Sequence, residues 1–101
     1  MNAPRTEDPS LSRGAHEVIK RMLAAEQAED FEDAEIVQDG RECWQGHYRT
    51  SAKVVMELLR SVLLRDCGEE KGVRRYSLNE DGRKACADPT WRPPEMRGLL
   101  R

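Results

Sequence analysis

Apolar residues recur at every third or fourth position along two stretches of the chain, and this pattern predicts two amphipathic helices. The first helix follows Ser10 and Ser12, either of which can cap it, and extends to about Asp30. The second helix follows Thr50 or Ser51. Its predicted buried face consists of Val55, Leu58, Leu59 and Val62.

A β-hairpin is predicted between the two helices. Asp39-Gly40 is a preferred pair for a two-residue turn in which both central residues have positive φ, and β-prone residues flank it. A competing interpretation makes residues 28–38 the second helix of an ordinary helix-turn-helix. We favour the hairpin, since the gap from Val37 to Thr50 is too long for a tight turn between helices.

A second pair of strands is predicted after the second helix. The first strand would be short, at residues 63–65, and a charged loop at residues 67–72 would follow it. Along residues 73–79, polar and larger apolar positions alternate, which predicts a strand half buried through Tyr76 and Leu78.

The order of these elements divides the chain into three parts. Residues 1–9 contain two prolines and mixed charge and are predicted to form a flexible arm. Residues 10–87 would form one small α+β domain that ends in a helical turn capped by Asn79. Residues 88–101 are a proline-rich tail carrying Trp91, which could fold back, anchor a partner, or cross to a second subunit in a homodimer. We favour folding back.

Length and composition restrict the classes of function that the chain can have. In 101 residues, 36% are charged, and no apolar run is long enough to span a bilayer. The first residues lack the apolar core of a signal peptide, so we expect a cytoplasmic protein without membrane contact. No motif pairs a nucleophile with a base or cradles a phosphate, so we expect no enzymatic activity and no cofactor. Widely spaced Cys43, Cys67 and Cys86 predict buried or half-buried thiols, with no metal site.

Charge is unevenly distributed along the chain. Residues 1–47 carry five basic and eleven acidic side chains, whereas residues 48–101 carry twelve basic and eight acidic ones. A protein with a net charge of −2 can still bind a polyanion when its basic groups share one face. The C-terminal half therefore contains the candidate residues for nucleic-acid binding.

The run from residue 50 to residue 86 resembles the recognition helix and wing of a winged helix-turn-helix regulator of the MarR-like kind. The resemblance rests on Leu58-Leu59, Leu63-Leu64 and the segment YSLNEDGR that begins at Tyr76, with Asn79 where threonine is usual. The chain departs from the family in two respects. It is too short for the long flanking dimerisation helices, and it places a predicted hairpin where the second helix should be.

The resemblance implies a small winged-helix transcription regulator, bacterial or phage-like, that binds double-stranded DNA. The recognition helix, at about residues 50–61, would enter the major groove, and the wing, at about residues 63–78, would contact the backbone. The candidate DNA-binding residues are Arg49, Thr50, Ser51, Lys53, Arg60, Lys71, Arg74 and Arg75.

An alternative function is a protein-binding adaptor or inhibitor that uses the same winged-helix fold. The acidic segment at residues 26–35 would then contact a basic partner, although a run of charge is often only a solvated surface. The candidate partner-binding residues are Glu29, Asp30, Glu32, Asp33 and Trp91.

Overall fold

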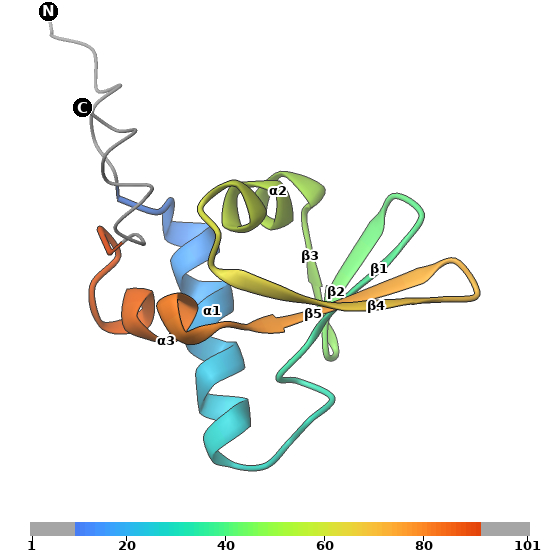
Figure 1. Ribbon diagram of the computed structural model, residues 1–101, viewed down its shortest axis with the longest axis horizontal. Helices are drawn as coiled ribbons and strands as arrows, with labels where there is room; N and C mark the ends of the chain where they lie inside the picture. Colours follow the sequence, from blue (N-terminus) through green and yellow to red (C-terminus); the bar gives the residue numbers. More distant parts are fainter. Residues whose placement is uncertain (1–9, 92–101) are drawn as a thin grey trace, which may run out of the picture.

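The computed structural model describes residues 10–91 and contains three helices and one antiparallel sheet (Figure 1). The elements in chain order are α1 (Arg13–Gln27), β1 (Ile36–Asp39), β2 (Glu42–Gln45), β3 (Tyr48–Thr50), α2 (Ala52–Arg60), β4 (Leu64–Glu70), β5 (Val73–Leu78) and α3 (Glu80–Ala87). The strand order across the sheet is β3-β2-β1-β5-β4. The α+β class is confirmed. The predicted arm at residues 1–9 and the tail beyond Trp91 lie outside the described residues.

The core lies between α1 and one face of the sheet. Helix α1 contributes Ala15, Val18, Ile19 and Met22, and they share one buried cluster with residues of α2, α3 and the strands. From the sheet, Ile36 pairs with Tyr76, and both side chains are buried in this cluster. Alternation along the strands therefore leaves the opposite face of the sheet without this apolar lining.

Of the two serines predicted to cap helix α1, Ser12 rather than Ser10 is the cap. The Ser12 hydroxyl accepts a hydrogen bond from the Ala15 N–H at 3.2 Å. The helix ends at Gln27, three residues before the predicted end at Asp30.

The hairpin between the helices is confirmed, and the competing helix at residues 28–38 is wrong, because residues 36–39 form β1. The turn lies one residue later than predicted. Asp39 pairs with Glu42 on β2 and with Val73 on β5, so it belongs to the sheet. Gly40 and Arg41 are the central turn residues, and Gly40 alone of the two has positive φ, at 62°.

Strand β4 is longer than predicted, and the expected charged loop at residues 67–72 is wrong. Residues up to Glu70 pair with β5, and only Lys71 and Gly72 form the turn, both with positive φ. A β-bulge between Asp66 and Gly68 accommodates the extra residue, Cys67. Every residue of β4 after Leu64 is exposed, so the strand lacks the alternation of buried and exposed positions from which a strand is predicted.

Val62 is an exception to the predicted buried face of α2. Helix α2 starts after the Ser51 cap and ends at Arg60, and Val62 adopts φ 59° with 46% of its surface exposed. Leu63 takes the buried position instead. The Val62 carbonyl accepts a hydrogen bond from the Asn79 side-chain amide at 2.8 Å, which holds this turn in place.

Asn79 caps α3 as predicted, because its side-chain oxygen accepts from the Gly82 N–H at 2.7 Å. Trp91 folds back onto the core, and its indole N–H donates to Asp81 at 3.0 Å. Beside it, the Leu11 N–H donates to the Pro89 carbonyl at 3.1 Å. This bond joins the two ends of the described domain.

Candidate nucleic-acid interface

The N-terminus of α2 is the centre of the candidate interface. The first N–H groups of a helix have no acceptor within the helix and carry partial positive charge. Ser51 satisfies one of them, since its hydroxyl accepts from the Val54 N–H at 3.1 Å. The rest of this first turn can receive an anion such as a phosphate. Thr50, which ends β3, is half-buried here.

A depression of about 450 Å³ lies beside this helix end, between α1 and α2. Three arginines line it together with Thr50 and Ser51, and they are Arg13, Arg21 and Arg49. The wall also includes one carboxylate, from Glu17. The depression is therefore mainly basic.

The three arginines differ in their other contacts. Arg21 donates to the Gln45 side chain at 2.8 Å and lies 4.8 Å over the Tyr48 ring. Arg49 lies 3.5 Å from a Glu42 oxygen and 5.6 Å over the ring of Trp44. Within residues 10–91, no ion pair involves Arg13, so it is the one of these three arginines most available to a ligand.

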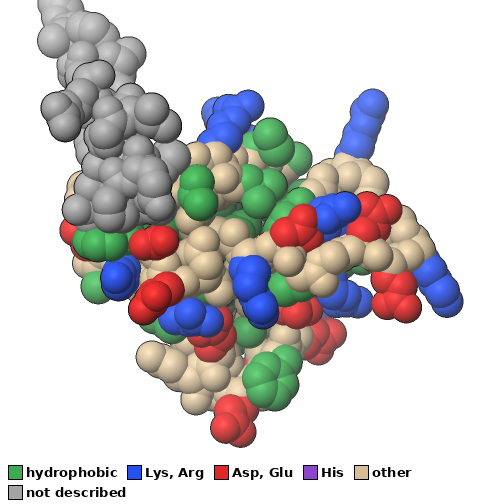
Figure 2. All heavy atoms as spheres, viewed as in Figure 1, with side chains coloured by type: hydrophobic (Ala, Val, Ile, Leu, Met, Phe, Trp, Pro, Cys, Tyr) green, Lys and Arg blue, Asp and Glu red, His purple; other side chains and the backbone are tan. Residues whose placement is uncertain are grey.

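The outward side of α2 carries the second group of candidates. Lys53 and Arg60 are exposed, and neither forms an ion pair with a described residue. Met56 lies between them with 44% of its surface exposed, and Val62 follows the helix. We call Lys53, Met56, Arg60 and Val62 the α2 basic face. Figure 2 shows basic and hydrophobic side chains together over α2.

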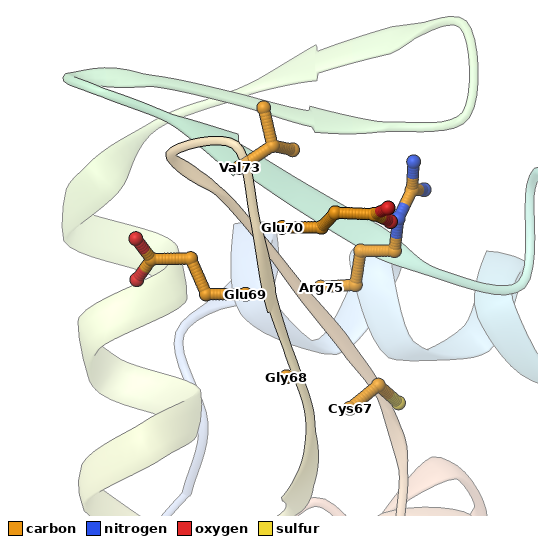
Figure 3. A pocket seen from close by; sticks show the side chains of 6 residues that line it. All are labelled: Cys67, Gly68, Glu69, Glu70, Val73 and Arg75. Carbon is orange, nitrogen blue, oxygen red and sulfur yellow. The ribbon is translucent and has the colours of Figure 1, made fainter.

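The predicted wing residues are less available. Arg74 forms ion pairs with Asp66 and with Glu69, at 3.0 Å for the latter, and the charge of Asp66 followed by the Glu69 hydrogen bond raises its pKa. Arg75 lies 3.5 Å from a Glu35 oxygen. Figure 3 shows Arg75 and Glu69 on opposite sides of the hairpin.

Lys71 has a different environment from the two wing arginines. It is exposed at the turn between β4 and β5, and no described residue forms an ion pair with it. The structure therefore brings Arg49, Thr50, Ser51 and Lys53 together at one end of α2, places Arg60 at the other end, and distributes Lys71, Arg74 and Arg75 along the hairpin.

Sequence reasoning missed Arg13 and Arg21, because no local pattern shows that the start of α1 lies beside the start of α2. The connection is a capping interaction. The side chain of Glu57 accepts hydrogen bonds from the Ser12 N–H at 2.8 Å and from the Ser12 hydroxyl at 2.7 Å. It fixes Arg13, the next residue, next to the N-terminal half of α2.

The acidic candidates lie at the other end of the molecule. Glu29, Asp30, Glu32 and Asp33 belong to the segment between α1 and β1, which we call the Phe31 loop (residues 28–35). Phe31 itself was not predicted as a candidate, and 73% of its surface is exposed. Trp91 is not part of this surface, because it lies near the N-terminal end of α1 whereas the loop follows the C-terminal end (Figure 1).

The cysteines only partly match their prediction. Cys43 is buried, and burial raises the pKa of the half-buried Cys86 to about 11. Cys67 is exposed, contrary to expectation, as is every residue of β4 after Leu64. Among residues 10–91, no three histidine, cysteine or acidic side chains are grouped as they would be around a metal ion.

Comparison of the chain with protein-family models, with curated proteins and with solved structures finds no match. None of the described helices combines the length and the apolar character needed to cross a membrane.

Proposed function

We propose that the protein binds double-stranded DNA as a small winged-helix regulator, with α2 in the major groove and the β4–β5 hairpin as the wing. The topology supports this proposal. Strand β1 pairs with β5, so the hairpin that follows α2 extends the central sheet as a wing does. Strands β2 and β3 occupy the chain positions of the usual second helix.

The observation that carries the proposal is that α2 combines a helix N-terminus with two cations, Lys53 and Arg60, that form no ion pair with a described residue. Lys53 and Arg60 are seven residues apart, which places them on one side of the helix about 10 Å apart along its axis. A helix of this size fits the major groove, where exposed side chains meet base edges. Arg13 and the amides around Ser51 would hold a phosphate at the groove wall.

The wing would contribute less to the DNA-binding energy than the sequence suggested. Arg74 and Arg75 would have to give up their carboxylate partners to bind phosphate, whereas Lys71 at the tip has no described partner to give up. The proposal therefore assigns most of the binding energy to α2 and to Arg13. The acidic Phe31 loop, at the opposite end, would point away from the DNA.

Fluorescence anisotropy with a labelled duplex of random sequence tests the proposal. The double variant Lys53→Glu/Arg60→Glu should weaken binding about tenfold or more, and log affinity of the native chain should fall linearly with log salt. Lys20→Glu is the charge control, because Lys20 is exposed on α1 on the side of Cys86, away from α2. No binding at low salt, or an equal loss in the control, would contradict the proposal.

A further inference from the structure

The Phe31 loop presents an aromatic ring to solvent. With 73% exposure, Phe31 is the most exposed large hydrophobic side chain among residues 10–91. The side chains around it, Glu29, Asp30 and Glu32, are acidic and exposed. Figure 2 shows hydrophobic and acidic side chains together at this lower end of the molecule.

The exposure of Phe31 is fixed by the backbone of the loop. The Asp30 N–H donates to the Ala25 carbonyl at 2.8 Å, and the Ala34 N–H donates to the Asp30 carbonyl at 3.1 Å. The side-chain amide of the fully buried Gln45 donates to the Asp33 carbonyl. A ring that is already held outward loses little conformational freedom on binding, so Phe31 is suited to anchor a partner.

The chain itself carries a surface of matching character. The α2 basic face combines Met56 and Val62, exposed by 44% and 46%, with two cations that have no described partner. Apolar groups surrounded by positive charge on α2 therefore complement an apolar ring surrounded by negative charge on the loop.

We propose that two copies of the chain associate head to tail, with the Phe31 loop of one copy on the α2 basic face of the next. The two surfaces lie at opposite ends of one molecule, so a single copy cannot join them (Figure 1). Each surface is small, so the contact is weak and reversible. This inference does not depend on DNA binding, although it uses the same face of α2.

Sedimentation velocity of the full chain, without DNA, tests the contact. Across about 10 µM to about 1 mM, the weight-average mass should rise with concentration, and added salt should reduce the rise. Phe31→Ser should weaken the association about tenfold, and Met56→Ser should weaken it in the same direction. Both side chains are exposed, so the circular dichroism spectrum should not change.

A charge exchange identifies the two surfaces. In the variant Glu29→Lys/Glu32→Lys the Phe31 loop loses most of its net negative charge, and in the variant Lys53→Glu/Arg60→Glu the helix face becomes acidic. Loop and helix face are then no longer complementary within either variant, so each should be a monomer by itself. Their equimolar mixture should associate, because the acidic loop of the second variant then meets the unchanged α2 basic face of the first. Adding Phe31→Ser to the Lys53→Glu/Arg60→Glu variant, whose loop makes this contact, should weaken the mixed complex. This loss separates docking of Phe31 from general attraction between oppositely charged proteins.

Three results would overturn the proposal. The native chain could remain a monomer at every concentration, which would leave the Phe31 loop to a basic partner other than the chain itself. The association could persist unchanged in Phe31→Ser, which would place the contact elsewhere. The mixture of charge variants could fail to associate. None of these results bears on DNA binding, which the anisotropy experiment tests separately.

Discussion

Glu57 caps the first helix from the second, because its two carboxylate oxygens accept from the N–H and the hydroxyl of Ser12. This pair joins the start of α1 to the middle of α2. It is a tertiary contact that also defines the candidate interface, since Arg13 follows Ser12 directly and lines the depression beside Ser51.

Replacement of Glu57 should therefore affect both stability and binding. We expect Glu57→Ala to lower the free energy of unfolding by about 1–2 kcal/mol, because the cap and a charge-assisted hydrogen bond are both lost. Chemical denaturation measures this change. DNA affinity should fall even though a negative charge has been removed, since Arg13 is no longer held in place. An increase in affinity would show that charge alone governs binding.

The two helical glycines should respond oppositely to alanine. A Cβ at Gly82 would lie 2.2 Å from the Leu63 carbonyl oxygen, so Gly82→Ala should destabilise the domain by about 2 kcal/mol or more. A Cβ at Gly14 would meet only Val54, at 3.5 Å. Gly14→Ala should stabilise α1 by about 0.5–1 kcal/mol. Thermal unfolding of the two variants measures both changes, and equal effects would refute this account of Gly82.

Thiol reactivity should separate the cysteines. At pH 8, a thiol reagent should modify exposed Cys67 first, because burial raises the pKa values of Cys43 and Cys86. The raised pKa of Cys86, about 11 against an ordinary 9.0, means that folding favours the neutral thiol. The neutral Cys86 thiol therefore makes its full contribution to stability below about pH 9, and this contribution is lost as the pH rises towards 11.

Mass spectrometry of partly alkylated protein identifies the cysteine modified first, and the Cys67→Ser variant is the control. Denaturation at pH 8 and at pH 10.5 measures the stability change, which Cys86→Ala should reduce. Fast modification of Cys86 at pH 8 would contradict its partial burial between α3 and α1.

The wing arginines should matter less than Lys53. We expect Arg75→Gln to weaken duplex binding less than Lys53→Gln, although both remove one charge, because Arg75 already has Glu35 as its partner. Anisotropy at two salt concentrations gives the comparison. A larger loss for Arg75→Gln would mean that the ion pair opens on binding and that the wing is the principal contact.

DNA and a second copy should compete for α2 if both proposals hold. Adding duplex to concentrated protein should then dissociate the head-to-tail species, since the α2 basic face cannot contact both. Sedimentation with a labelled duplex measures the change. Phe31→Ser should bind DNA as well as the native chain does at low protein concentration and better at high concentration. Association that increases with duplex would contradict competition.

The features predicted correctly from the sequence are those that neighbouring residues determine. Ser12, Ser51 and Asn79 cap helices because each side chain reaches an N–H three residues later, a relationship visible in the sequence itself. The alternation that buries Tyr76 and Leu78 is equally local. The fold class follows from the order of such elements.

The wrong or missed predictions concern features that depend on residues far apart in the sequence. Strand β4 continues past its bulge because β5 pairs with it and Arg74 bridges Asp66 and Glu69, which no local pattern of residues 64–70 shows. Val62 leaves the buried face because Asn79 holds its carbonyl. The role of Arg13 depends on Glu57, which lies 45 residues beyond Ser12.

The chain enters the described domain near Leu11 and leaves it near Pro89. These two points are within hydrogen-bonding distance, because the Leu11 N–H donates to the Pro89 carbonyl. A short linker could therefore join these points in a circular permutant with new ends in the exposed turn at Lys71-Gly72. The same proximity would allow the domain to be inserted into a surface loop of a larger host protein without stretching that loop. Such fusions would hold α2 near the attachment point and present the Phe31 loop at the far end of the domain.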